Sequence, residues 1–128
     1  MGRLVPIAIT LAALGGIATM AISKAAAQEG RNVYVITHVD VIGSGGNLPE
    51  AVRLVSEFVA ESRQDAGVIR FEAFQQEGHP NHFTIYEVWQ NRGAFDAHLA
   101  AEHAKRFRQA LQPMLGSPFR ERLHYLVR

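Results

Sequence analysis

The chain contains no cysteine among its 128 residues. This absence excludes disulfide bonds, thiolate catalysis, iron–sulfur clusters and zinc sites with cysteine ligands. The sequence also lacks an H-E-x-x-H segment, a P-loop and a complete G-x-G-x-x-G motif, because Leu48 stands where the last glycine of the Gly-rich segment would be. We interpret residues 43–46 as a flexible turn.

Neither sign of charge is in clear excess. The sequence has 13 Lys and Arg against 12 Asp and Glu, which gives a formal net charge of +1. No basic run or basic helix face is present, so we expect no nucleic-acid partner.

One long apolar run occurs, at the N-terminus. Arg3 precedes residues 4–22, which are apolar apart from two threonines, and three alanines at 25–27 follow. This succession is typical of a signal peptide at residues 1–27. Cleavage there would leave residues 28–128 as a periplasmic or secreted domain without a membrane contact. The alternative is an uncleaved membrane anchor formed by residues 4–22, whose length approaches that of a membrane span.

Strand and helix patterns alternate along residues 28–128. Alternating apolar and polar residues rich in β-branched side chains predict strands at residues 33–42, 68–76, 82–90 and 120–127. Apolar residues at helical spacing predict helices from Asn47 to about residue 63, and from Asn91 to Pro113 with a break at residues 100–101. The order β-α-β-β-α-β predicts an α+β, ferredoxin-like domain in which helices cover one face of a four-stranded antiparallel sheet.

The other face of this sheet would still carry apolar side chains. In the first strand, for example, Tyr34 and Ile36 point away from Val33 and Val35. A small soluble monomer rarely exposes such a patch. We therefore expect a homodimer that packs sheet against sheet, and the alternative is a monomer with a partly covered open face.

The predicted strand at residues 82–90 carries an acid in an apolar row. Glu87 points to the same face as Ile85 and Trp89. Burying an unpaired carboxylate is costly, so we expect Glu87 at an edge, beside a partner or in a pocket. One candidate partner is Arg70 on the preceding strand.

Histidines supply the candidate bases, since imidazole is the usual general base near neutral pH. His38 lies in mid-strand beside Asp40, while His98 and His103 lie near the apolar stripe of a helix. With this helix packed on the sheet, we expect His98 and His103 to line a pocket whose other members are Asn81, Glu87, Trp89 and Tyr125.

We expect no metal ligands in this set. His98 and His103 are five residues apart, which places them roughly 140° apart around an α-helix of about 3.6 residues per turn. Two imidazoles so placed would not bind one ion from one helix face.

The residues Glu87-x-Trp89, Phe95, Ala97-His98 and His103 resemble the E-x-W…F-x-A-H-x(4)-H signature of the antibiotic biosynthesis monooxygenase (ABM) family. The resemblance extends over about residues 32–127. It implies a dimeric α/β barrel built from two ferredoxin-like chains. Known members include cofactor-independent monooxygenases of quinols and polycyclic phenols. Related proteins degrade haem or isomerise a small phosphorylated dione.

The resemblance thus implies a cofactor-independent monooxygenase that oxidises a quinol or related phenol, and the predicted signal peptide adds that it is exported. Its partners would be a small aromatic substrate, dioxygen and a second copy of the chain. Carried over by position, Trp89, His98 and His103 would be pocket residues and Glu87 an orienting group. Together with the placement of the histidines, this predicts His38, His98 and Trp89 as catalytic residues, with His38 or His98 as the base. We expect the substrate contacts to be Asn81, Tyr86, Glu87, His103 and Tyr125. Two alternatives stay open: a dimer that binds haem or another hydrophobic ligand without turnover, and an isomerase of a small carbonyl compound.

Overall fold

The computed structural model describes residues 30–43 and 47–128. The elements follow the order β1 (Val33–Asp40), α2 (Asn47–Ser62), β2 (Val68–Gln76), β3 (His79–Trp89), α3 (Arg92–Ala100), α4 (Glu102–Leu111), the 3₁₀ turn η1 (Gln112–Met114) and β4 (Arg120–His124). The predicted signal peptide lies outside the described residues. Within those ranges, no helix is both long and apolar enough to cross a membrane.

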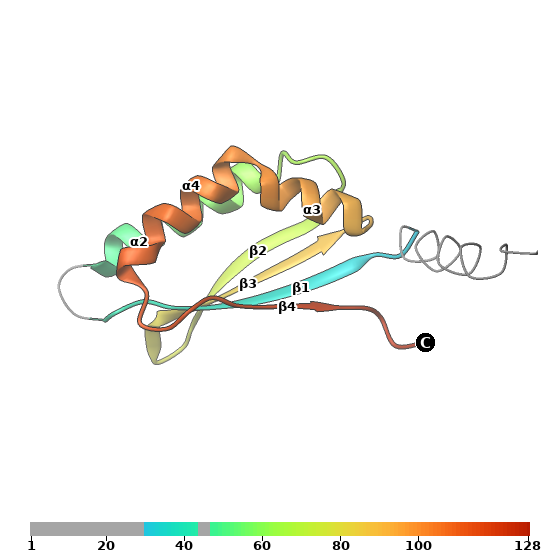
Figure 1. The fold of residues 1–128 in the computed structure, drawn as a ribbon. Helices are drawn as coiled ribbons and strands as arrows, with labels where there is room; N and C mark the ends of the chain where they lie inside the picture. The colour runs from blue at the N-terminus through green and yellow to red at the C-terminus, as the bar shows by residue number, and fades with distance from the viewer. Residues whose placement is uncertain (1–29, 44–46) are drawn as a thin grey trace, which may run out of the picture.

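The four strands form one antiparallel sheet in the order β2-β3-β1-β4. Helices α2, α3 and α4 lie on one face of this sheet and leave the other face open (Figure 1). The predicted α+β, ferredoxin-like fold is therefore confirmed. The β1–β3 register places Val35 opposite Glu87 and Thr37 opposite Ile85, so these four side chains share the helix-covered face.

Several strand boundaries differ from the prediction. β1 ends at Asp40, two residues before the predicted end, and β3 ends at Trp89, one residue before it. β3 begins at His79, earlier than predicted, because the hairpin from β2 turns within Glu77–Gly78. Gly78 has φ of 75°, a conformation that glycine adopts without strain. β4 ends at His124 rather than at Val127, so the last residues extend beyond the sheet.

The core lies between the helices and the sheet. Val33, Val35 and Val39 of β1 are at most 1% exposed. Above them the rings of Phe58 on α2 and Phe107 on α4 stack with centroids 4.0 Å apart. Each side chain of this kind stabilises the fold by about 1.5–3 kcal/mol when fully buried. Within this apolar layer Glu87, Thr37 and His98 are each only 3% exposed.

The turn between α2 and β2 is fixed by Gly67. Its φ is 81°, and a Cβ at this position would lie 2.6 Å from the Cβ of Ala94 on α3. Its carbonyl also accepts a hydrogen bond of 2.8 Å from the backbone N–H of Gln90 at the end of β3. This turn, which contains Asp65, is thus held against the start of α3.

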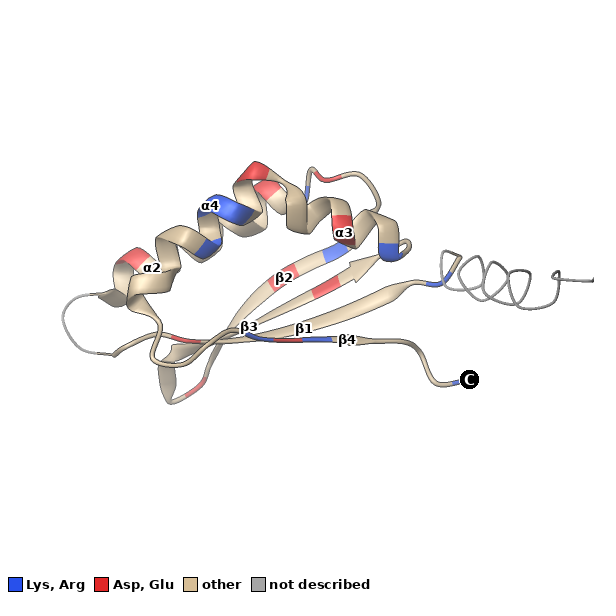
Figure 2. Cartoon of the chain, viewed as in Figure 1, with Lys and Arg blue, Asp and Glu red and all other residues tan. Residues whose placement is uncertain are grey.

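The predicted break between the last two helices is confirmed. Ala101 has an extended ψ of 147°, which ends α3 and starts α4. The predicted cap at Asn91 is also present, since its side chain accepts a 2.8 Å hydrogen bond from the backbone N–H of Ala94. Acidic and basic segments are interspersed over the helices and strands (Figure 2).

Candidate functional site

Glu87 is buried beneath the helices, with 3% of its surface exposed. Its Oε2 accepts a hydrogen bond of 2.8 Å from the indole Nε1–H of Trp89. Arg70, the candidate partner from the sequence, pairs instead with Glu72 at 3.0 Å. The Glu87–Arg70 alternative was wrong because Arg70 lies opposite Val88 and so faces away from Glu87.

Burial raises the pKa of the Glu87 carboxyl to about 7. The hydrogen bond from Trp89 acts in the opposite direction, and the nearby charges of Glu121 and Arg108 oppose each other. Glu87 therefore exchanges its proton near neutral pH, which is the property required of a general base.

A small cavity adjoins Glu87 between the sheet and the helices. Its volume is about 10 Å³, room for about one water molecule. Arg108 on α4 and Glu121 on β4 form an ion pair of 2.5 Å at this cavity, and their side chains are 37% and 21% exposed. The remaining lining residues are Thr37, Phe58, Ile85, Phe107 and Phe119.

Thr37 brings an unsatisfied hydroxyl to the same cavity. The residue is 3% exposed, and its Oγ1 has no hydrogen-bond partner within the described parts of the chain. A buried polar group without a partner costs about 1–3 kcal/mol. A water molecule or a ligand oxygen in the cavity would remove this cost. The cavity thus combines a base at Glu87 with a free donor at Thr37.

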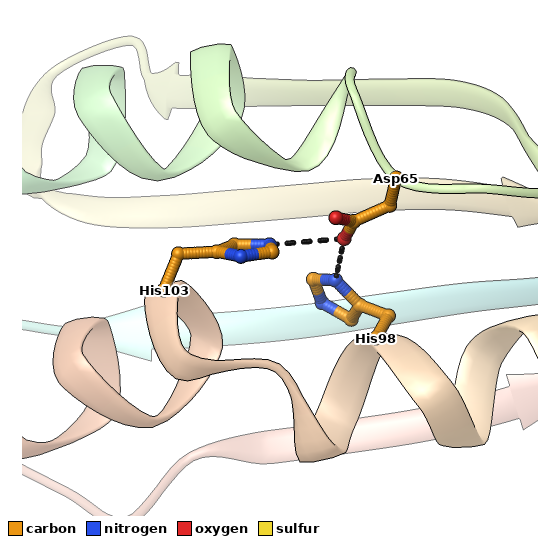
Figure 3. Close-up of side chains that lie close together, drawn as sticks. All are labelled: Asp65, His98 and His103. Carbon is orange, nitrogen blue, oxygen red and sulfur yellow. Dashed lines mark hydrogen bonds and ion pairs between the residues drawn. The ribbon is translucent and has the colours of Figure 1, made fainter.

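A second polar cluster consists of Asp65, His98 and His103 (Figure 3). Asp65 Oδ2 accepts a hydrogen bond of 2.7 Å from His98 Nδ1 and one of 2.9 Å from His103 Nε2. Because an ionised carboxylate only accepts, both imidazoles donate an N–H, which fixes their tautomers. Burial lowers the pKa of His98, although the Asp65 carboxylate opposes this shift.

This cluster corrects our expectation that His98 and His103 diverge. That expectation assumed one continuous helix, whereas Ala101 interrupts it. His98 projects from α3 and His103 from the first turn of α4, and both rings point towards Asp65 (Figure 3). One nitrogen of each ring and a carboxylate oxygen lie within 4.8 Å of one another.

Trp89 links the cluster to the cavity. Its indole N–H binds Glu87, and its ring lies against His98 with centroids 4.7 Å apart and planes tilted by 34°. Phe71 packs against the same histidine at 5.5 Å. Trp89 is fully buried, so core packing, the alternative considered for it, is confirmed, and its catalytic role stays a prediction.

Four of the predicted site residues thus come together: Glu87, Trp89, His98 and His103. Two others lie on the open face of the sheet. His38 is exposed there, with its Nδ1 3.3 Å from Thr84 Oγ1. Tyr86 pairs with Ile36 in the register, and the guanidinium of Arg70 lies 5.7 Å from its ring. The structure therefore separates His38 from His98 by the thickness of the sheet.

The remaining two predicted residues lie elsewhere. The Nδ2 of Asn81 donates a 3.2 Å hydrogen bond to the carbonyl of Val41, which secures the beginning of β3 rather than its Trp89 end. Tyr125 lies just after β4, with the guanidinium of Arg31 5.0 Å from its ring. The sequence-based prediction missed four polar residues of the two clusters: Thr37, Asp65, Arg108 and Glu121.

The fold and this site define a class of small α+β proteins in which a glutamate–tryptophan pair is buried between the helices and the sheet. The family model for antibiotic biosynthesis monooxygenases matches residues 32–110. The chain belongs to this family, which confirms the resemblance found in the sequence.

Solved structures share the fold. An antibiotic biosynthesis monooxygenase is 24% identical with a TM-score of 0.71, covering 75% of this chain and 99% of that chain. PA3566 from Pseudomonas aeruginosa is 21% identical with a TM-score of 0.69 and coverages of 77% and 96%. Rv0793 from Mycobacterium tuberculosis is 17% identical with a TM-score of 0.66 and coverages of 76% and 96%. At these identities the similarity shows the fold alone.

A curated relative, the protein sll1783 of Synechocystis sp., is 30% identical over 69 residues. The match covers 54% of this chain and 47% of that protein. The chain therefore spans about half the length of the curated relative that it matches.

Proposed function

We propose that the protein is a monooxygenase that oxidises a quinol or related phenol with dioxygen and uses Glu87 as the general base. The observation that carries the proposal is a buried carboxyl with a pKa of about 7 beside a cavity. Membership of the monooxygenase family supports the reaction class. The aromatic walls of the cavity, Phe58 and Phe107, support a planar apolar substrate.

In the proposed reaction Glu87 removes a proton from the substrate. The Thr37 hydroxyl donates a hydrogen bond to the anion that forms, and the positive charge of Arg108 stabilises it. Trp89 holds Oε2 of Glu87, so the other carboxylate oxygen remains available to the substrate. The electron-rich anion then reduces dioxygen. For an anthrone-like substrate the balance is R₂CH₂ + O₂ → R₂C=O + H₂O, in which one oxygen atom enters the product and the other leaves as water.

The site must open before a substrate can bind. Ligand pockets usually measure about 300–1,000 Å³, whereas this cavity measures about 10 Å³. Arg108 and Glu121 join α4 to β4 beside the cavity through a partly exposed ion pair. Such a pair contributes only about 0–1 kcal/mol. The separation of α4 from β4 at this point therefore offers the easiest entry.

The geometry favours Glu87 over the two histidines as the base. His98 has a side chain 1% exposed and packs against Trp89, and it does not line the cavity beside Glu87. His38 faces the open side of the sheet, where it would act only in a site completed by another molecule. The catalytic roles that the sequence predicts for these histidines remain predictions, as does export through residues 1–27.

We also propose that the open face packs against a second copy of the chain. It carries apolar side chains that include Ile36 and Phe74, and Phe74 is 52% exposed. An uncovered sheet face that exposes apolar side chains is typical of an interface in small proteins. Sedimentation velocity at micromolar concentration should give a dimer, and a monomer at all concentrations would refute this part.

Oxygen uptake tests the proposed reaction. The full chain, treated with a chelator, is assayed with a panel of hydroquinones and anthrone-like phenols. We expect uptake in the wild type, loss in Glu87→Gln, and retention in Glu57→Gln, where the same change is made on the exposed surface of α2. Uptake that Glu87→Gln leaves unchanged would refute Glu87 as the base. A folded wild type with no uptake would favour ligand binding without turnover, and a hemin titration would then test its haem version.

A further inference from the structure

We propose that Asp65, His98 and His103 form a binding site for a divalent first-row transition-metal ion such as Zn²⁺. The three residues come from three separate parts of the chain: the turn after α2, helix α3 and the first turn of α4 (Figure 3). The proposal does not rest on the proposed oxygenase, because it concerns binding of the ion alone.

The donor set suits this class of ion. Two imidazole nitrogens and one carboxylate oxygen are ligands that Zn²⁺ and its neighbours in the series accept readily. Mg²⁺ prefers oxygen ligands in an octahedral arrangement and is a poor match. Three protein ligands also leave at least one coordination position for water.

The distances require only a small adjustment. Asp65 Oδ2 lies 2.7 Å from His98 Nδ1 and 2.9 Å from His103 Nε2. One donor atom from each residue lies within 4.8 Å of the other two. Bonds of about 2.0–2.2 Å in a tetrahedral site hold neighbouring ligand atoms about 3.3–3.6 Å apart. The carboxylate oxygen must therefore retreat from the two nitrogens by roughly 0.4–0.9 Å. The ion takes the place of the two N–H protons that now point at Oδ2, and each imidazole, which binds the ion in its neutral form, then carries its proton on the other ring nitrogen.

The surroundings hold one ligand firmly and leave a path to the others. The His98 side chain is 1% exposed and lies among the rings of Phe58, Phe71 and Trp89. Asp65 and His103 have side chains 19% and 15% exposed. An ion can reach these two ligands from solvent, and the apolar shell around His98 reduces competition from water.

A second His–Asp pair provides an internal comparison. On the open face of the sheet, His82 Nδ1 lies 2.5 Å from Asp40 Oδ1. Asp40 also accepts a hydrogen bond from Ser117, and Arg120 lies 3.7 Å away. The nearby guanidinium repels a cation, so His82 serves as the matched control for the loss of one imidazole.

Metal titration of the full chain tests the proposal. The protein, freed of any affinity tag and treated with a chelator, is titrated with Co²⁺ in the visible range and with Zn²⁺ by calorimetry at pH 7.5. We expect one ion per chain, displacement of Co²⁺ by Zn²⁺, and no response to Mg²⁺. His103→Gln and Asp65→Asn should weaken binding at least about tenfold, which is the lower end of the loss seen even for outer-shell changes. His82→Ala should bind as the wild type does.

Thermal unfolding gives an independent readout. At a free Zn²⁺ concentration of about 100 times Kd, the Tm of the wild type should rise on the order of 10 °C. The rise should disappear in His103→Gln and persist in His82→Ala. Stoichiometric binding that both His103→Gln and Asp65→Asn retain, or no binding by a wild type whose circular dichroism shows the native fold, would overturn the proposal. Neither result depends on oxygen uptake, so failure here is distinct from failure of the proposed reaction.

Discussion

Replacing Glu87 with glutamine should stabilise the folded protein much more at pH 8 than at pH 5. Burial raises the pKa of Glu87 to about 7 from an ordinary value of 4.5. Between these values the folded state binds more protons than the unfolded state, so the stability of the wild type falls as pH rises. Glutamine stays neutral and avoids this loss.

The magnitude follows from the two pKa values. With a folded pKa of about 7, the Glu87 carboxyl lowers the free energy of unfolding by about 0.8 kcal/mol at pH 5 and by about 3.4 kcal/mol at pH 8. The substitution should therefore gain about 2.5 kcal/mol between the two pH values. Glutamine can still accept the Trp89 hydrogen bond through its own oxygen, and any cost of its amide N–H₂ group is the same at both pH values.

Urea unfolding of wild type and Glu87→Gln at pH 5 and pH 8 measures this difference. Glu57→Gln controls for the same chemical change on an exposed surface, where substitutions usually alter stability by less than about 0.5 kcal/mol. An equal effect of Glu87→Gln at both pH values would show that the buried carboxyl titrates near its ordinary pKa. The reasoning about Glu87 as a base would then fail as well.

Three further predictions concern the turns, the cap and the indole. Gly67→Ala should lower the free energy of urea unfolding by at least about 2–3 kcal/mol, because left-handed backbone strain adds to the clash with Ala94. Gly78→Ala should cost only the strain, about 1–2 kcal/mol. Equal costs for the two variants would argue against the clash. Asn91→Ala should lower the free energy of unfolding by about 1 kcal/mol through loss of the helix cap, measured in the same way. Trp89→Phe removes the hydrogen bond that lowers the pKa of Glu87. The pKa should therefore rise further, and the loss of stability with increasing pH should continue to a higher pH than in the wild type. An unshifted dependence in that variant would contradict the role of the indole.

The fold was predictable because local patterns agree with the tertiary structure. Strand alternation at Val33–Asp40 and helical spacing at Asn47–Ser62 each bury one face, and each forms the predicted element. The cap at Asn91 and the break before Glu102 also follow from local residue preferences. The end of β4 was predicted less well, because its last apolar residues, such as Val127, are 95% exposed.

The candidate site was predicted only in part, because its residues meet through tertiary contacts. The Glu87-x-Trp89 spacing places both side chains on one face of a strand, and the structure keeps them there. Asp65 carries no local signal that joins it to His98, since the two are 33 residues apart and meet only when the turn packs on α3. Arg108 and Glu121 likewise meet only when α4 packs over β4.

Strand register explains why the prediction placed His38 in the site whereas the structure places Thr37 there. His38 alternates with Thr37, so one of them must face the helices and the other the open side. The sequence favoured His38 for its chemistry, whereas the structure turns Thr37 inwards beside Glu87 and leaves its hydroxyl without a partner in the described part of the chain. Which face the helices cover depends on packing, and the pattern of β1 allowed both.

The pH dependence of oxygen uptake in metal-free protein tests the central claim most directly. With any substrate of the panel that is oxidised, kcat/KM of the wild type should rise with pH through about 7 and then level off, as the pKa of Glu87 requires. Glu87→Gln should remain folded and lose at least about 100-fold in rate, the usual contribution of a general base. A Glu87→Gln protein that keeps the wild-type rate and pH profile would contradict the account.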